Sequence, residues 1–215
     1  FSQITYAVTP SAGAGGSISP GTAQEIAQGS TTTFTVRAND GYEVASVGGT
    51  CGGSLSGNTY TTNAITAACT VDASFSQITH AVTPTAGEGG SISPSTAQMI
   101  AEGSTTTFTL TTESGYAIMA VGGTCGGSLS GNTYTTNAIT AACTVDASFT
   151  QNTFGVTPNA GVGGTISPST EQAIAEGSTT TFTVTPDEGY RIAAVGGTCG
   201  GSLLANVFRA NSGGT

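Results

Sequence analysis

The stretch GSTTTFTVRANDGYEVASV, residues 29–47, contains two segments of alternating apolar side chains separated by a turn signal. Phe34 and Val36 fall on one face of the first segment, and the threonines beside them fall on the other. Thr and Val are β-branched and favour strands, whereas Asn39-Asp40-Gly41 is a strong tight-turn signal. The stretch therefore predicts two short strands joined by a turn, with Phe34 and Val36 facing a core.

The same stretch recurs at residues 103–121 and 177–195, so the fold it predicts is repeated. Three copies open at Phe1, Phe75 and Phe149, which are 74 residues apart with no insertion. A fixed period of this length is typical of a repeat array. It predicts module 1 at residues 1–74, module 2 at residues 75–148, and an incomplete module 3 at residues 149–215.

Each copy contains further short segments of strand character between Gly- and Pro-rich turns. Six or seven strands per module at this spacing suit a small sandwich or a single curled sheet. The predicted fold class is all-β, in tandem small β-rich modules. The inward parity changes at Ser76-Gln77, and a two-residue connector is too short for a flexible linker. We therefore expect the modules to stack as a rod.

The charge content excludes some classes of partner. Charged residues make up 7% of the chain, there is no Lys, and the formal net charge is −9. Binding to nucleic acid or to an anionic membrane needs Lys and Arg, so neither is expected. No apolar run approaches the ~20 residues of a membrane span. Phe1 fills the slot of Phe75 and Phe149, as if the chain were cut from a longer array or a processed precursor.

The cysteines repeat with the modules. The pairs Cys51/Cys69 and Cys125/Cys143 have the same spacing, and Cys199 stands alone in the third copy. Zinc sites favour tight C-x-x-C pairs, which are missing, so the spacing favours disulfides within each module and no metal. Disulfides indicate an oxidising compartment, so the protein is expected to be secreted, periplasmic or at the cell surface. For Cys199, three possibilities stay open: a partner beyond Thr215, a partner in another chain, or a buried free thiol.

The third copy departs from the others after Leu203, where LANVFRANSGGT replaces SGNTYTTNAITA of the second copy. The final strand, CTVDASF in the other copies, is missing from it. A module without its last strand exposes an unpaired edge, which another chain can fill by β-augmentation. Head-to-tail, such a contact builds a filament. The residues expected at the exchanging ends are Phe1, Ile4, Tyr6, Val8, Val207 and Phe208.

The run GGSISP…GSTTTFTV…GY…VGGTCGG…YTTNAIT…CTVDASF resembles a bacterial surface repeat, the divergent relative of the internalin B-repeat. The resemblance covers residues 1–148 and most of residues 149–215. Relatives usually carry Trp a few residues after the GY element, where this chain has Val47, Val121 and Val195. Membership implies small β-grasp-like or sandwich-like modules, a stalk or adhesive role, and no catalytic residues.

Candidate catalytic and metal-binding residues have simpler explanations. His80 is the one histidine, but its equivalents are Tyr6 and Phe154, so the position suits a planar packing residue. Asp72 and Asp146 recur on the outward face of the last strand, where an edge-strand charge discourages unwanted pairing. A weak calcium loop at residues 39–43 or 187–188 lacks the spaced oxygen ligands of known sites.

These observations predict a secreted, non-enzymatic structural repeat protein of the bacterial surface, a stalk segment or a fibre subunit, without a cofactor. Its expected partners are copies of itself, head-to-tail, or neighbouring repeats of a longer chain. The alternative is an adhesin that recognises a glycan or a host protein. Glycan sites usually present exposed aromatic side chains, for which Tyr60 and Tyr134 are the candidates.

Overall fold

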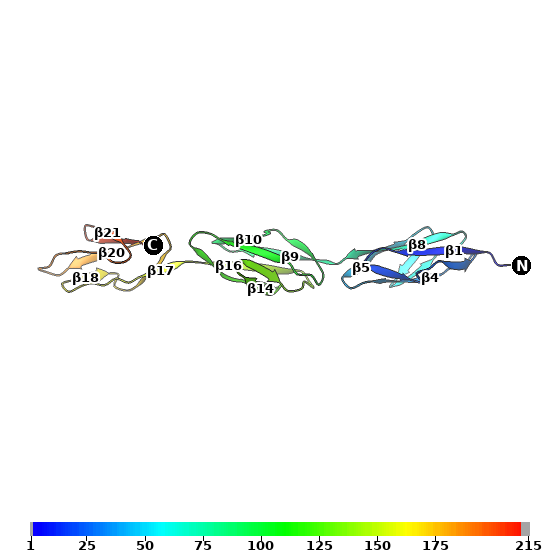
Figure 1. The fold of residues 1–215 in the computed structure, drawn as a ribbon, viewed down its shortest axis with the longest axis horizontal. Coiled ribbons are helices and arrows are strands. Elements are labelled where there is room, and N and C mark those ends of the chain that lie inside the picture. Colours follow the sequence, from blue (N-terminus) through cyan, green and yellow to red (C-terminus); the bar gives the residue numbers. More distant parts are fainter. Residues whose placement is uncertain (1, 212–215) are drawn as a thin grey trace. The chain divides into compact units, whose positions relative to one another are not determined.

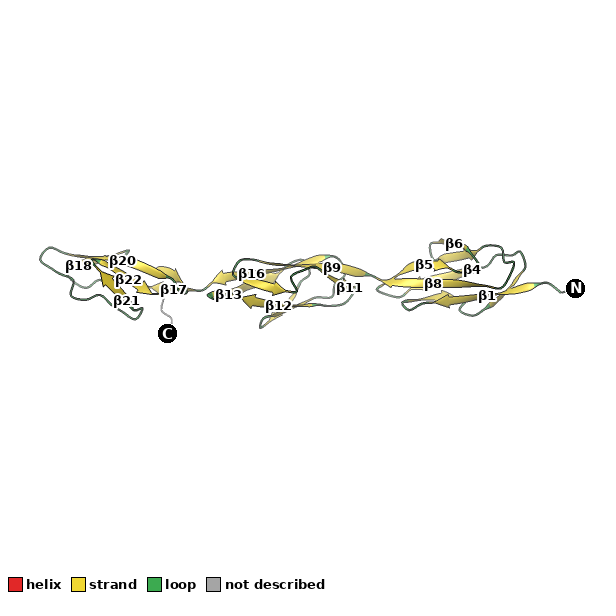
Figure 2. Cartoon of the chain, turned by 90° about the horizontal axis from the view of Figure 1, so that it is seen from above, coloured by secondary structure: helices red, strands yellow, loops and turns green. Residues whose placement is uncertain are grey.

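The computed structural model describes residues 2–211, and this range contains 22 strands and no helix (Figures 1 and 2). The fold is therefore all-β, as the sequence predicts. No helix that could span a membrane occurs in the described range. The strands of module 1 are β1 (Thr5–Ala12), β2 (Gly16–Ser19), β3 (Gln24–Ala27), β4 (Thr33–Ala38), β5 (Tyr42–Gly48), β6 (Gly53–Ser56), β7 (Thr59–Thr62) and β8 (Cys69–Gln77).

Module 1 is a sandwich of two four-stranded sheets with the orders β3-β1-β8-β5 and β2-β4-β7-β6. The first and last strands are neighbours, because β1 pairs in parallel with β8 from Val8↔Cys69 to Ala12↔Ala73. The other pairings are antiparallel. β4 and β5 lie in different sheets, so the Asn39-Asp40-Gly41 turn carries the chain from one layer to the other. Of the two architectures implied by the family resemblance, the sandwich-like one is present.

The two sheets of module 1 enclose one apolar core. Phe34 and Val36 are 1% and 0% exposed, which confirms the inward parity predicted for them. They pack with residues of both sheets, including Val8 on β1, Tyr60 on β7 and Val71 on β8. β8 thus contributes directly to the core and lies between two other strands of its sheet.

A β-bulge in β5 changes which of its side chains face the core. The register against β8 shifts between Val44 and Ser46, so Ala45 has no direct partner. Val44 and Val47 are therefore both half-buried against the core, although an unbroken alternation would turn Val47 outward. The shift recurs in module 2 between Ile118 and Ala120.

Module 2 repeats this plan with the sheet orders β11-β9-β16-β13 and β10-β12-β15-β14. By backbone proximity the chain divides into two compact units, one of which contains residues through Val82 with residues 98–106 and 136–143. The module limits therefore stay a prediction. The strands are β9 (Thr79–Ala86), β10 (Gly90–Ser93), β11 (Gln98–Ala101), β12 (Thr107–Thr112), β13 (Tyr116–Gly122), β14 (Gly127–Ser130), β15 (Thr133–Thr136) and β16 (Cys143–Gln151).

Module 3 keeps one sheet and reduces the other. Its four-stranded sheet has the order β18-β20-β22-β21, and β17 pairs only with β19. Phe182 faces Phe208 across β20 and β22, as Phe108 faces Tyr134 in module 2, so residues 206–208 do replace residues 132–134. Its strands are β17 (Thr153–Val156), β18 (Gly164–Ser167), β19 (Gln172–Ala175), β20 (Thr179–Pro186), β21 (Gly201–Leu204) and β22 (Val207–Asn211).

Candidate functional site

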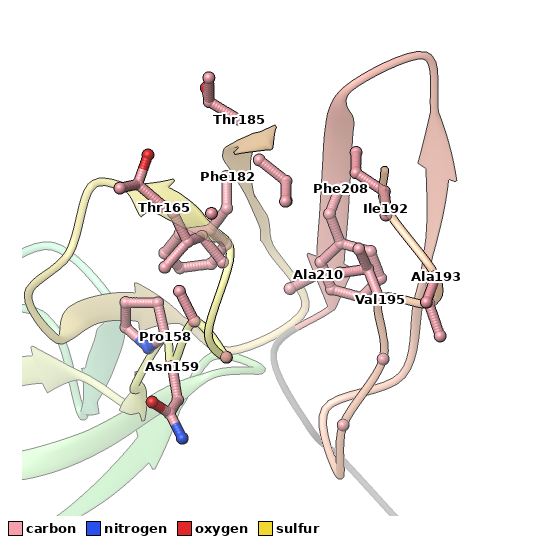
Figure 3. A pocket seen from close by; sticks show the side chains of 18 of the residues that line it. Pro158, Asn159, Thr165, Phe182, Thr185, Ile192, Ala193, Val195, Phe208 and Ala210 are labelled. Carbon is pink, nitrogen blue, oxygen red and sulfur yellow. The ribbon is translucent and has the colours of Figure 1, made fainter. Parts of the chain in front are cut away.

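A groove in module 3 lies where β8 and β16 lie in the other modules. It is a cavity of about 410 Å³, and among the described residues of module 3 no strand corresponds to β8. Figure 3 shows Pro158 and Thr165 on one side of it, and Ile192 and Val195 on the other. Phe182, Phe208 and Ala210 also line it. The groove therefore lies beside the core of the module, and polar residues such as Asn159 and Arg191 line it together with the apolar ones.

The strands that flank β8 in module 1 are shortened or lost in module 3. β1 has eight residues, whereas the equivalent β17 has four and ends at Val156. The missing part, residues 157–160, corresponds to residues 9–12, which are four of the five residues of β1 that pair with β8. Residues 190–196, which correspond to β5, form no strand. In module 1 both segments form hydrogen bonds with β8, and none of residues 154–211 takes that position in module 3.

Three glycines of module 1 and their equivalents in module 3 differ in the atoms that surround them. A Cβ on Gly16 would lie 2.2 Å from the ring of Phe75, whereas at Gly164 the nearest atoms are backbone atoms of residues 185 and 186. A Cβ on Gly49 would meet the Thr70 carbonyl at 2.3 Å, but the equivalent Gly197 has nothing within 4 Å. Gly13 and Gly161 differ in the same way: the first approaches the carbonyl of Ala73, and the second has open space. The groove therefore includes the site of an aromatic ring and of a strand backbone.

The cysteines differ between the modules in the same way. Cys51 and Cys69 form a disulfide with a Cα–Cα distance of 5.0 Å, joining the turn after β5 to the start of β8. Cys125 and Cys143 are also disulfide-bonded. Cys199 is a free, half-buried thiol that lines the groove. Cys199 pairs with no cysteine of the described residues, so the three possibilities for it stay open.

The residues expected to exchange between chains are occupied within their own modules. Tyr6 and Val8 belong to β1, and Val8 is fully buried. Val207 and Phe208 belong to β22, where Phe208 is 7% exposed. Of the N-terminal residues, Ile4 precedes β1 and is 57% exposed, and Phe1 lies outside the described residues. An exchange through β1 or β22 would require a module to open.

The junctions between modules contain one residue each outside the strands. β8 ends at Gln77 and β9 begins at Thr79, so Ser76 and Gln77 extend β8 and do not form a connector. The N–H of Ile78 donates to the Gly41 carbonyl of module 1 at 2.8 Å, and its carbonyl accepts the N–H of Glu102 of module 2 at 3.0 Å.

Asn152 repeats this arrangement at the second junction. Its N–H donates to Gly115 at 2.8 Å, and its carbonyl accepts the N–H of Glu176 at 2.9 Å. The Asn152 side chain adds a bond from Nδ2 to Glu176 Oε2, at 2.8 Å. The sequence pattern predicts a connector at Ser76-Gln77 and does not reveal these bonds, because they join residues that are distant in the sequence.

His80 lies beside the carboxylate of Glu102. Its Nε2 lies 3.5 Å from Glu102 Oε2, and the two side chains are 21% and 38% exposed. The pair attracts electrostatically only when the imidazole is protonated. Residues 2–211 contain no group of three or more His, Cys, Asp or Glu side chains that could hold a metal ion.

Asp72 does not lie on an edge strand, so that interpretation is wrong. β8 is an interior strand of its sheet. The Asp72 carboxylate accepts hydrogen bonds from Ser11 Oγ at 2.6 Å and Thr70 Oγ1 at 2.9 Å, and the Thr70 N–H donates to Thr50 Oγ1 at 2.9 Å. Asp146 accepts the equivalent bonds in module 2. The recurring Asp therefore links β1, β8 and the turn that carries the disulfide.

Tyr60 and Tyr134 are core residues, so they cannot form an exposed glycan platform. Each is 2% exposed. Burial raises the pKa of both phenols above the usual value of 10.0, because it disfavours the ionised form. The adhesin alternative thus loses the aromatic residues on which it was based.

The family model of the divergent InlB B-repeat domain matches the chain three times, at residues 6–79, 80–153 and 154–212. These matches have the period found in the sequence, with a frame that begins five residues later. No curated protein and no solved structure matches the chain. Because the three matches cover nearly the whole chain, the protein belongs to the divergent InlB B-repeat family.

Proposed function

We propose that this chain is a non-enzymatic structural segment of an extracellular bacterial surface protein, in which the modules form a stiff spacer. The family is one of surface repeats, and disulfide bonds are typical of proteins outside the cytoplasm. A repeated module adds length, whereas a catalytic site needs one asymmetric set of residues. His80 lies beside Glu102, but the equivalents of His80 are Tyr6 and Phe154, so this pair does not recur in the other modules.

The observation that carries the proposal is the bonded junction residue. Ile78 uses its N–H for the module before it and its carbonyl for the module after it. Asn152 does the same. A linker that bends freely requires several residues with solvated backbone groups. A single residue bonded on both sides offers no such solvated backbone, so it favours a stiff spacer.

Small-angle X-ray scattering of the full chain tests stiffness. We expect a narrow distribution of maximum dimensions for the natural chain. Inserting Gly-Ser-Gly-Ser between Gln77 and Ile78 should shorten and broaden that distribution, because the two backbone bonds can no longer form together. The same insertion after Gly57, where the β6–β7 turn has open space, is the matched control and should leave it unchanged. A natural chain as variable in dimension as the junction variant would contradict the proposal.

A further inference from the structure

The two sheets of module 1 differ in what their outer faces carry. On the sheet β3-β1-β8-β5, hydroxyls donate to carboxylates of the same face, as Thr5 Oγ1 does to Glu25 Oε2 at 2.9 Å and Ser11 Oγ does to Asp72 Oδ1 at 2.6 Å. On the sheet β2-β4-β7-β6, the outward side chains are Ser or Thr, with Arg37 as the exception. The first face uses its polar groups within the module, and the second presents hydroxyls to solvent.

The outward side of the second sheet is called the hydroxyl face here, and its residues share three properties. They alternate with core residues, they are exposed or half-buried, and their side chains make no hydrogen bond within residues 2–211. In module 1 they are Ser17 and Ser19 on β2, Thr33 and Thr35 on β4, Ser54 and Ser56 on β6, and Thr59 and Thr61 on β7. In module 2 they are Ser91, Ser93, Thr107, Thr109, Thr111, Ser128, Ser130, Thr133 and Thr135.

Strand pairing arranges these hydroxyls as a lattice. Thr33 lies opposite Thr61, and Thr35 lies opposite Thr59, so two Thr-x-Thr segments are in exact register on β4 and β7. Thr107 and Thr109 pair in the same way with β15 in module 2. The threonines therefore repeat at about 6.8 Å along a strand and about 4.8 Å across strands. Because the β-branched Thr side chain has few rotamers, the hydroxyls are held in place before any ligand binds.

The serines extend each lattice at its sides. Ser19 lies opposite Thr35, and Ser56 lies opposite Thr59, so one row of hydroxyls crosses all four strands of module 1. Neighbouring strands of a sheet are rotated by about 20–25°, which gradually turns the row. The regular part of the lattice is therefore the pair of central strands, β4 with β7 and β12 with β15.

A lattice of neutral hydroxyls suits ordered water better than a sugar or a charged partner. Glycan sites usually present exposed aromatic side chains, whereas Phe34 and Tyr60 of the same strands point into the core. The hydroxyl faces carry no carboxylate or amide side chain. A hydroxyl donates and accepts hydrogen bonds as water does. The oxygen atoms on a prism face of hexagonal ice repeat in two perpendicular directions, at distances close to those of the threonine lattice.

Module 3 keeps the sheet but not the lattice. Thr181 and Thr183 of β20 lie opposite Arg209 and Val207, where modules 1 and 2 have threonines. Arg209 Nε donates to Thr179 Oγ1 at 3.0 Å, so one hydroxyl of β20 is also used within the module. The chain thus contains two intact hydroxyl faces and one interrupted copy of the same sheet.

We propose that the hydroxyl faces of modules 1 and 2 bind the surface of ice, with the paired threonines of the two central strands holding water molecules that join the ice lattice. Two faces on one chain strengthen attachment, because release of one leaves the other near the surface. The proposal goes beyond the spacer function and does not depend on stiffness at the junctions. It assigns the repeated module a solid ligand of regular spacing.

Ice-affinity partitioning of the full chain tests the proposal. A dilute solution is frozen slowly from a cold surface, and the protein in the ice is compared with the protein in the remaining liquid. We expect the natural chain to be enriched in the ice. The double variant Thr35→Lys and Thr109→Lys places a charge in the middle of both lattices and should lower the enrichment at least about tenfold. A natural chain excluded from ice to the same extent as this variant would overturn the proposal.

The matched control makes the same two substitutions on the opposite sheet. Thr9 on β1 and Thr83 on β9 are exposed threonines outside the hydroxyl faces, so Thr9→Lys with Thr83→Lys should leave the enrichment unchanged. Equal loss in the two double variants would overturn the proposal, because net charge would then determine the result. Circular dichroism and the thermal midpoint of each variant establish that the modules stay folded.

A gain of binding tests the lattice itself. Val207→Thr with Arg209→Thr restores the paired threonines in module 3 and should raise the ice-bound fraction above that of the natural chain. An unchanged fraction would contradict the role of the paired threonines. Retention on crystalline cellulose is measured in parallel. If the natural chain is retained there, Thr35→Lys with Thr109→Lys abolishes retention, and ice excludes both proteins, the hydroxyl face binds carbohydrate and the proposal fails.

Discussion

Modules 1 and 3 have closely similar sequences through the GGTCGG motif, yet only one of them forms two complete sheets. The sheet that contains β2, β4, β6 and β7 has a counterpart with the same strand order in module 3. The other sheet is reduced to β17 and β19, although residues 157–160 and 190–196 still resemble their equivalents. We infer that β5 and the second half of β1 form strands because they pair with β8. Their local strand propensity alone is not sufficient.

The cores of the two modules also differ in how deeply equivalent side chains are buried. Val184 and Ile166 in module 3 are half-buried, whereas the equivalent Val36 and Ile18 in module 1 are 0% and 8% exposed. β8 of module 1 therefore also covers side chains of the opposite sheet. A single strand accounts for contacts in both layers because its inward side chains lie at the centre of the sandwich.

The largest effect on stability is expected when β8 of module 1 is disrupted. Val71→Asp places a charge in the fully buried centre of β8 and should destabilise module 1 by ~3–5 kcal/mol. Calorimetry of the full chain should show one module unfolding earlier, and limited proteolysis should cut first in module 1. Val162→Asp is the control, since Val162 is 99% exposed and should change stability by less than about 0.5 kcal/mol. Equal effects of the two substitutions would refute the central role of β8.

The next effect concerns the disulfide of module 1. Replacing both Cys51 and Cys69 by Ser should cost about 3 kcal/mol, since the bond restricts the unfolded chain. Denaturant titration of the full chain measures the loss. Cys199→Ser, which breaks no bond, should shift the midpoint far less. A shift as large as that of the double variant would show that the thiol itself, and not the crosslink, determines stability at this position.

A smaller effect is expected at the carboxylate that links β1 to β8. Asp72→Ala removes the acceptor of the Ser11 and Thr70 hydroxyls and should cost about 1 kcal/mol, because these bonds are exposed to solvent. Asn159→Ala in module 3, at the position equivalent to Ser11, should have almost no effect on thermal stability. If Asp72→Ala is equally silent, the network is a consequence of strand pairing and contributes nothing to it.

The sequence predicted the features that depend on short-range pattern. The period, the all-β class and the inward facing of Phe34 and Val36 follow from alternation and turn residues. The features it missed depend on which strands become neighbours. Asp72 was placed on an edge because β8 is last in the sequence, but the parallel pairing with β1 makes it interior. The sequence pattern is compatible with Tyr60 at the surface or in the core. The pairing of β4 with β7 places Tyr60 opposite the buried Phe34.

The smallest effect at neutral pH concerns a position where the modules differ by one oxygen. Tyr60 and Tyr134 correspond to Phe208. Tyr60→Phe should change stability by less than about 1 kcal/mol at pH 7, since both states of the protein are then protonated at this residue. Above about pH 10 the unfolded chain releases the phenolic proton while the folded module, in which the pKa of Tyr60 is raised, retains it. The natural chain should therefore lose stability with rising pH relative to Tyr60→Phe, with module 1 responsible for the difference. The measurement is the denaturant midpoint of both proteins from pH 8 to about pH 11. If the difference between the two midpoints does not change over this range, the Tyr60 hydroxyl is hydrated in the folded module and the expectation is wrong.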